Sequence, residues 1–160
     1  MGMAKPLSQL GKDIKAGLEL GLEKAAHDIT YQLKDQGPYW TGEFEQAWVV
    51  KTGDGLIASN KAGVPFDELP EKPLQRPAEP SPTAVPLPDL KKGYAIGNEM
   101  DYADIAMDLV PGADGTYRGE RPRETSKTGR DWFERYVLGG GMKQTVEGAM
   151  KTGFGVAGFK

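Results

Sequence analysis

The feature that most constrains the fold is a long amphipathic pattern that ends at Gly37-Pro38. Across residues 8–36, apolar side chains recur at steps of three and four, which places them on one face of an α-helix. Proline lacks an amide proton and glycine relaxes a helix C-terminus, so the pair should end the helix. The pattern therefore predicts one long helix with a single apolar stripe. The stripe consists of Leu10, Ile14, Leu18, Leu22, Ala25, Ile29 and Leu33.

Three glycines interrupt the first half of this predicted helix: Gly11, Gly17 and Gly21. Each weakens a helix by about 1 kcal/mol relative to alanine. We therefore expect the first half either to kink or to become ordered only against a neighbouring element.

An aromatic stretch follows the helix stop. Trp40, Phe44 and Trp48 recur every four residues, so a helical turn over residues 41–47 would align them on one face. Thr41-Gly42 is typical of a turn before it. Buried aromatic side chains usually serve packing, which makes these residues candidate core anchors. The alternative is a tryptophan that contacts a partner.

The next segments are typical of strands and turns. Residues 49–52, the turn at 53–55 and residues 56–59 together predict a β-hairpin, because Asp-Gly between short strands favours that turn. Residues 93–98 predict a return to strand, with a turn at Gly97-Asn98. A short helix is expected over residues 100–109.

Residues 61–93 contain eight of the twelve prolines. This density disfavours helix and central strand, and favours extended backbone. The segment is either a disordered excursion or an arm that docks on a neighbouring subunit. Long loops within a compact domain are often functional.

The C-terminal part predicts two helices separated by a break. Residues 131–138 have an apolar side that includes Trp132, and Gly139-Gly140-Gly141 should end that helix. A further helix is expected over residues 142–151. Glycine is too frequent beyond it to predict a regular element, so we treat residues 139–160 as a glycine-rich extension.

Composition limits the function classes. A chain of 160 residues fits a single domain, 1–160, with one core. The net charge of −3 argues mildly against a general nucleic-acid-binding protein. There is no cysteine and no apolar run near the roughly 20 residues that span a bilayer. We expect a soluble protein of a reducing compartment, with no membrane partner.

Candidate catalytic and metal-binding patterns are sparse. His27 is the only histidine and lies within the predicted helix, so neither a serine–histidine pair nor a usual zinc site is expected. We expect no enzyme activity, no metal and no cofactor. A carboxylate-based hydrolase is the least favoured alternative; it would use Asp101, Asp104 and Asp108. A second alternative is a nucleic-acid-associated protein that uses the basic segment 118–130, with Arg118, Arg121, Arg123, Lys127 and Arg130.

Three segments resemble the head–tail joining, or neck, proteins of tailed bacteriophages. The first is the long helix leading into Pro38-x-x-Thr41-Gly42-x-Phe44-x-x-x-Trp48. The second is Ile96-Gly97-Asn98 followed by Tyr102-Ala103, and the third is Trp132 on a closing helix. Where the family often has Glu-x-Gly after Tyr-Ala, this chain has Met107-Asp108-Leu109. The residues that carry the resemblance are Trp40, Thr41, Gly42, Phe44, Trp48, Gly97, Asn98, Tyr102, Ala103 and Trp132.

The resemblance implies an α+β fold, with the long helix packed on a small, mostly antiparallel sheet. It also implies a structural virion protein, assembled in the host cytoplasm, that forms a homo-oligomeric ring at the neck or the top of the tail. Implied partners are a portal-side connector or head-completion protein and a tail tube or sheath protein, with DNA only passing through the channel. The resemblance implies no catalysis.

Apolar residues of the arm 61–93 and of the C-terminal extension are candidates for contacts between subunits. Such segments often become ordered on assembly. We expect deletion of residues 66–90 to spare the monomer fold and to impair assembly. The candidate contact residues are Phe66, Leu69, Leu74, Val85, Leu87, Phe154 and Phe159.

Overall fold

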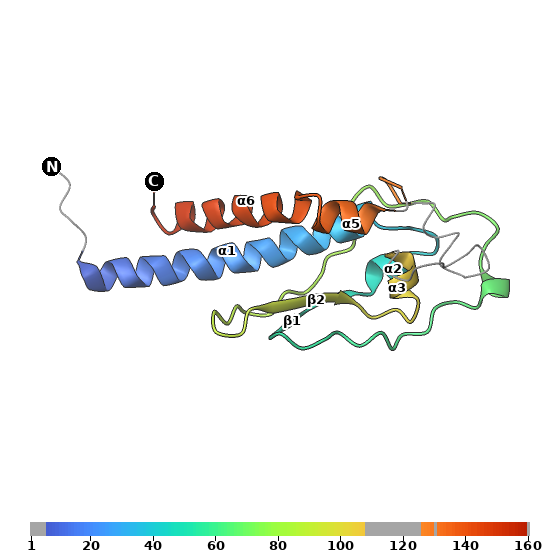
Figure 1. The fold of residues 1–160 in the computed structure, drawn as a ribbon, viewed down its shortest axis with the longest axis horizontal. Helices are drawn as coiled ribbons and strands as arrows, with labels where there is room; N and C mark the ends of the chain where they lie inside the picture. The colour runs from blue at the N-terminus through green and yellow to red at the C-terminus, as the bar shows by residue number, and fades with distance from the viewer. Residues whose placement is uncertain (1–5, 108–125, 130, 160) are drawn as a thin grey trace.

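The computed structural model describes residues 6–107, 126–129 and 131–159, without the side chains of Phe66 and Ile105. The fold is α+β, as predicted: two long antiparallel helices, α1 and α6, lie on one side of a two-stranded antiparallel sheet (Figure 1). The molecule is elongated, and the start of α1 and the end of α6 lie at the same end of it.

Helix α1 spans Leu7–Gln36 and confirms the predicted long helix. A hydrogen bond of 3.1 Å from the Gly37 amide to the Leu33 carbonyl ends its last turn. Thirty residues make a helix of about 45 Å, whereas five-residue strands extend only about 17 Å. The sheet therefore covers only part of α1, and Leu10 and Ile14 of the predicted stripe remain 36% and 40% exposed.

The sheet pairs β1, Trp48–Thr52, with β2, Tyr94–Asn98. Trp48 lies opposite Asn98, and Thr52 lies opposite Tyr94. The strand predicted at 93–98 is therefore confirmed, but the hairpin between 49–52 and 56–59 is wrong. Residues 56–59 form no strand, and β1 finds its partner beyond a connection that runs from residue 53 to residue 93.

The physical reason is that residues 56–59 offer no buried strand face. Leu56 is fully exposed, while Ile57 lies against β2 at Gly97. A Cβ atom at Gly97 would lie only 2.7 Å from the Ile57 Cβ, so Gly97 is the residue that admits Ile57. The predicted turn at Gly97-Asn98 is also wrong, because both residues belong to β2.

In the part of the chain that the structure describes, four short helical segments connect the larger elements, and α3 is shorter than the helix predicted over residues 100–109. Gly42, with φ +89°, adopts the left-handed conformation directly before α2, which fits the predicted Thr41-Gly42 turn. The segments are α2, Glu43–Gln46; the 3₁₀ turn η1, Phe66–Glu68; α3, Ala103–Ala106; and α5, Trp132–Val137.

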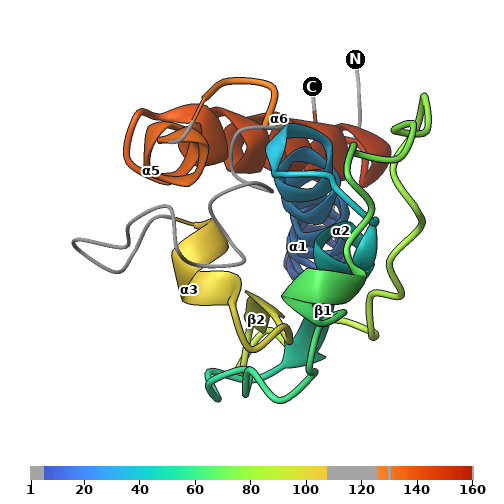
Figure 2. The same ribbon diagram turned by 90° about the vertical axis from the view of Figure 1, so that its right-hand side faces the viewer.

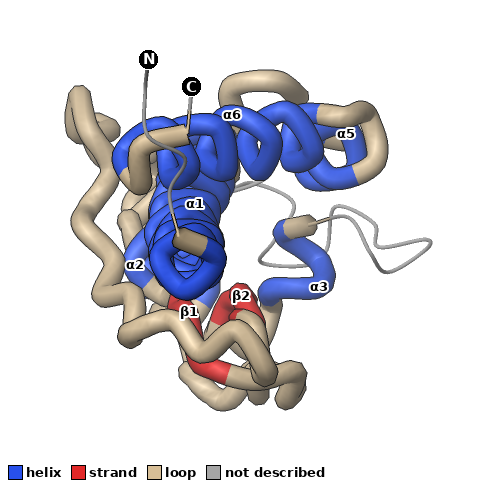
Figure 3. Tube along the Cα trace, turned by 90° about the vertical axis from the view of Figure 1, so that its left-hand side faces the viewer, coloured by secondary structure: helices blue, strands red, loops and turns tan. Residues whose placement is uncertain are grey.

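Helix α6, Gly141–Val156, packs along α1. Figure 3 views this pair along α1, with the strands on the opposite side of α1 from α5 and α6. The helix continues past Gly153, where the sequence predicted no regular element. It does so because Gly153 meets Gly17 and Gly21 of α1 backbone to backbone: a Cβ at Gly153 would lie 2.6 Å from the Gly17 carbonyl oxygen. Helix α1 is continuous through these glycines.

The core lies where α1, α2, β1, α3 and α5 meet. The connection 53–93 leaves the sheet, turns at η1 and returns beside α1 and α2 (Figure 2). We call its returning part, residues 69–90, the strap. The buried core residues are Leu33, Phe44, Ala47, Trp48, Met100, Ala103, Ala106, Trp132 and Tyr136.

Candidate functional site

Four of the residues that carry the resemblance belong to the core, although they come from three distant parts of the sequence: Phe44, Trp48, Ala103 and Trp132. Phe44 packs edge-to-face against both Trp48 and Trp132, with ring centroids 5.8 and 6.1 Å apart. Trp132 is completely buried, and its indole N–H donates to the Ala106 carbonyl at 3.0 Å. Ala103 is 1% exposed in the same cluster. The aromatic residues are thus packing anchors of one core.

Asn98 joins two of these segments through hydrogen bonds. It is 4% exposed at the end of β2. Its side-chain nitrogen donates to the Phe44 carbonyl at 2.7 Å, and its side-chain oxygen accepts from the Met100 amide at 3.0 Å. The first bond satisfies a carbonyl of α2, and the second shapes the turn from β2 toward α3.

Trp40 and Tyr102 lie at the margin of this core rather than inside it. Phe44 and Trp48 share the predicted face, but Trp40 is only half-buried. Its indole N–H donates to the Pro70 carbonyl at 2.9 Å, and its own carbonyl accepts from the Leu74 amide at 2.8 Å. Tyr102 stacks on Phe44 with ring centroids 6.3 Å apart. Trp40 therefore attaches the start of the strap to the core.

Arg76 fastens the strap to the C-terminal end of α1. Its guanidinium donates to the carbonyls of Asp35, at 2.7 Å, and of Gly37, at 2.5 Å, and lies 5.2 Å from the Tyr39 ring centroid. A cation here satisfies carbonyls that a helix end leaves unpaired and complements the helix dipole. Burial lowers the pKa of the Arg76 guanidinium, with neighbouring acidic groups opposing the shift.

A second attachment is a buried polar cluster made by Lys34, Glu45 and Ser81. The Lys34 ammonium donates to the Ser81 carbonyl at 2.9 Å, and Glu45 accepts from the Ser81 amide at 2.6 Å. The Lys34 and Glu45 side chains are 2% and 5% exposed, and their charged atoms lie 4.0 Å apart. Burial lowers the pKa of Lys34, and the charge of Glu45 partly offsets that effect.

The sequence patterns do not identify these attachment residues. Lys34, Glu45, Arg76 and Ser81 were not among the candidate residues. Arg76 binds main-chain carbonyls, and such contacts produce no pattern of side-chain spacing in the sequence. A lysine at the end of a predicted helix, followed by a distant arginine, is too common a combination to have identified the contact.

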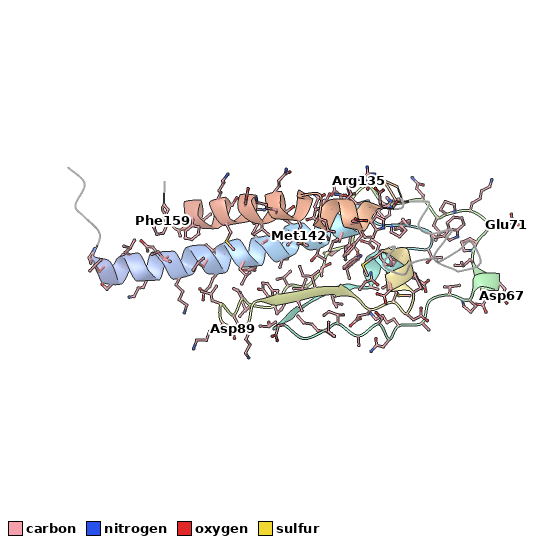
Figure 4. The ribbon with its side chains drawn as sticks, in the orientation of Figure 1. Asp67, Glu71, Asp89, Arg135, Met142 and Phe159 are labelled. Atoms are coloured by element: carbon pink, nitrogen blue, oxygen red, sulfur yellow. The ribbon has the colours of Figure 1, made fainter. Side chains whose placement is uncertain are left out.

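The candidate contact residues come from two parts of the chain, the arm and the C-terminal extension. Leu74 and Leu87 are 52% and 85% exposed. Leu69 and Val85 are half-buried, and Phe66 is described only by its backbone in η1. Phe154 covers Gly17 and packs edge-to-face on Phe159, with ring centroids 5.5 Å apart. Figure 4 places η1 residue Asp67 and Phe159 toward opposite ends of the molecule, so the candidates do not form one surface.

The residues of the two alternative functions are only partly described. Arg118, Arg121, Arg123 and Arg130 of the basic segment lie outside the described residues, and Lys127 forms an ion pair with Asp35. Asp101 and Asp104 are exposed, while Asp108 lies outside the described residues. His27 is exposed on α1.

Among the residues that the structure describes, no three His, Cys, Asp or Glu side chains are grouped as metal ligands. No helix in the described part of the chain has the length and apolar character needed to cross a bilayer. In comparisons with known proteins, no family model, no curated protein and no solved structure matches this chain.

Proposed function

We propose that this chain is a structural protein of a tailed bacteriophage, which forms a ring at the neck that completes the tail and joins it to the head. The observation that carries the proposal is the convergence of the three segments that resemble neck proteins. Phe44 and Trp48, Asn98 with Ala103, and Trp132 come from separate parts of the chain and share one core or hydrogen-bond to it. A resemblance at separate positions in the sequence is a stronger argument when the matching segments build a single structural unit.

The surface supports an assembly role. The strap is held to the body by directed hydrogen bonds, while two of its leucines face solvent. The proposed partners are further copies of the chain, a portal-side connector or head-completion protein, and a tail tube or sheath protein. DNA passes through the ring without being held, which suits a chain with net charge −3.

The test is electron microscopy of particles from a phage in which this gene is disrupted. We expect filled heads beside unattached tails if the protein joins the two, and overlong tails if it terminates the tail. Supplying the intact gene in trans should restore complete particles. Normal infectious particles without the gene would contradict the proposal.

A salt titration of DNA binding gives an independent check. Contacts with phosphate produce affinity that falls steeply with salt. We expect the purified protein to bind DNA weakly at physiological salt, and a tight, salt-sensitive complex would instead favour a nucleic-acid-associated protein.

A further inference from the structure

The strap turns two polar side chains toward the body and leaves two leucines exposed. Arg76 binds the end of α1, and Ser81 lies between Lys34 and Glu45. Leu74 and Leu87 point away and are 52% and 85% exposed. Hydrogen bonds therefore hold the strap in place, and these leucines contribute little to that attachment.

Leu87 is the most prominent of these side chains. It lies between Pro86 and Pro88, which restrict the backbone to extended conformations. The Pro86 carbonyl accepts a hydrogen bond from the Tyr94 hydroxyl at 2.5 Å, so β2 fixes this part of the strap. A rigid, extended, proline-flanked leucine is pre-organised for insertion into a groove, because little conformational freedom remains to be lost.

The same chain carries a groove that suits such a side chain. It lies between α1 and α6, has a volume of about 380 Å³ and is open to solvent. Leu20 and Val156 line it and are 40% and 71% exposed, with Thr152 and Gly153 beside them. Leu87 does not fill the groove of its own chain, since it remains 85% exposed.

We infer that Leu87 of one copy inserts into the α1–α6 groove of a second copy. Charge complementarity supports a second copy as the occupant. Glu23 lines the groove, and Lys24, the only lysine or arginine among the described residues that line it, pairs with Asp28 at 2.8 Å. Lys91 follows Leu87 by four residues and forms no ion pair with another described residue, so it can approach Glu23 of the neighbouring copy.

The size of the contact agrees with a ring. One leucine with its flanking prolines covers far less than the roughly 800 Å² per partner of a stable two-protein interface. A single contact is therefore weak. In a ring, each copy inserts its Leu87 into one neighbour and accepts Leu87 from the other. Once the ring closes, each contact forms within one assembly, at a high effective concentration. The expectation of a ring rests on the proposed function.

Sedimentation velocity over a concentration series tests the contact with lysine variants. We expect the wild-type chain to associate as concentration rises. Leu87→Lys and Val156→Lys should each remain monomeric with unchanged thermal unfolding, because both side chains are exposed. Leu56→Lys, which changes a fully exposed leucine outside the strap, should associate like the wild type.

Mixing the two defective variants provides the decisive measurement. The Val156→Lys chain still has Leu87, and the Leu87→Lys chain still has an intact groove. Because only one contact per pair remains, we expect an equimolar mixture to form a species of two chains, and nothing larger, at the upper end of the concentration series. A mixture of folded variants that stays monomeric even at the highest concentration would overturn the inference, as would a wild-type chain that never associates or a Leu87→Lys chain that associates normally.

Particle microscopy separates this inference from the proposed function. If the gene-disrupted phage makes normal particles while the purified wild-type chain associates through Leu87, the contact stands and the proposed function fails. If the gene proves essential for joining while Leu87→Lys associates like the wild type, the function stands and this contact is wrong.

Discussion

At the scale of single residues, Asn98 joins elements that lie 54 residues apart in the sequence. Its two side-chain bonds join β2 to α2 and to the turn before α3, and the side chain is 4% exposed. Water cannot replace these bonds without opening the core. The asparagine was noted in the sequence as a turn residue, whereas the structure gives it a strand position and a connecting role.

Replacing Asn98 with alanine should therefore destabilise the fold. The change leaves the Phe44 carbonyl and the Met100 amide buried without these partners, and each such group costs about 1–3 kcal/mol. We expect a loss of roughly 2–4 kcal/mol in urea unfolding. Asn60→Ala, at an exposed position, is the control and should change stability by less than about 0.5 kcal/mol. Equal effects of the two substitutions would contradict the role given to Asn98.

Glu99 provides a pH-dependent contribution to stability. Its carboxylate contacts Lys61 at 2.8 Å and Lys51 at 3.6 Å. The hydrogen bond from Lys61 is the main cause that lowers the pKa of Glu99 below its ordinary value of 4.5. The unfolded chain then binds more protons than the folded chain between the two pKa values. This stabilisation is present above pH 4.5 and is lost as the pH falls through the lowered pKa.

Glu99→Gln should remove this part of the acid dependence. We expect the variant to be less stable than the wild type near neutral pH and the difference to shrink as the pH falls below 4.5. Chemical denaturation at a series of pH values measures it. Glu134→Gln, at an exposed position of α5, should follow the wild-type curve throughout. A constant difference between Glu99→Gln and the wild type at every pH would refute the assignment.

At the scale of elements, the contact between α1 and α6 depends on the absence of side chains. A Cβ atom at Gly153 would lie 2.4 Å from the Gly21 amide nitrogen, and neither backbone can retreat without separating the helices. Gly148 lies on the same helix and has no atom within 4 Å of the corresponding position. One helix therefore contains a glycine required by packing and a glycine that packing does not require.

Alanine substitutions at these two positions should have opposite effects. Gly153→Ala should destabilise the protein by about 2 kcal/mol, because overpacking costs up to about 3 kcal/mol and alanine returns about 1 kcal/mol of helix propensity. Gly148→Ala should stabilise it by up to about 1 kcal/mol. Thermal unfolding by circular dichroism measures both. Changes of the same sign would show that propensity, and not helix contact, determines the effect of Gly153.

These elements also show how much of the fold the sequence could predict. The long helix and the strand at 93–98 follow from periodicity and from Gly37-Pro38, which are local signals. The hairpin prediction failed because the turn signal of Asp54-Gly55 is also local. Strand β1 instead pairs with β2, which follows the strap in the sequence. The three α1 glycines were interpreted as weaknesses. Two of them are contact points with α6, which no spacing within α1 alone reveals.

For the candidate site, the sequence predicted the core anchors better than the surface. Phe44, Trp48 and Trp132 are large aromatic residues, and such residues are usually buried. The strap was predicted as extended backbone from its prolines, but its attachment was not. Arg76 binds carbonyls, and Ser81 of the strap hydrogen-bonds both Lys34 and Glu45. Polar contacts of this kind depend on tertiary structure.

At the scale of the whole molecule, the strap is part of the folded body and not only an arm. This changes the expectation for deletion of residues 66–90, which the sequence suggested would spare the monomer. The deletion removes Arg76 from the end of α1 and Ser81 from Lys34 and Glu45. Hydrogen bonds to charged groups contribute about 1.5–3 kcal/mol each, so we expect a loss of at least about 2 kcal/mol.

Thermal unfolding of the deletion variant and of Arg76→Ala tests this expectation. Arg76→Ala should account for part of the loss, since Ser81 and Trp40 still hold the strap. Leu74→Lys, which alters an exposed strap residue, should leave the unfolding temperature unchanged. A deletion variant as stable as the wild type would show that the strap contributes only to assembly.

The pairing of α1 with α6 also has a consequence for the order of events during synthesis. The ribosome completes α1 first, but residues 37–140 must follow before α6 emerges to cover Gly17 and Gly21. Until then the glycine-weakened half of α1 has no partner helix, and an isolated helix of that kind frays readily. The nascent chain therefore exposes part of its apolar stripe for most of its translation, and the earliest segment to be made is among the last to reach its final packing.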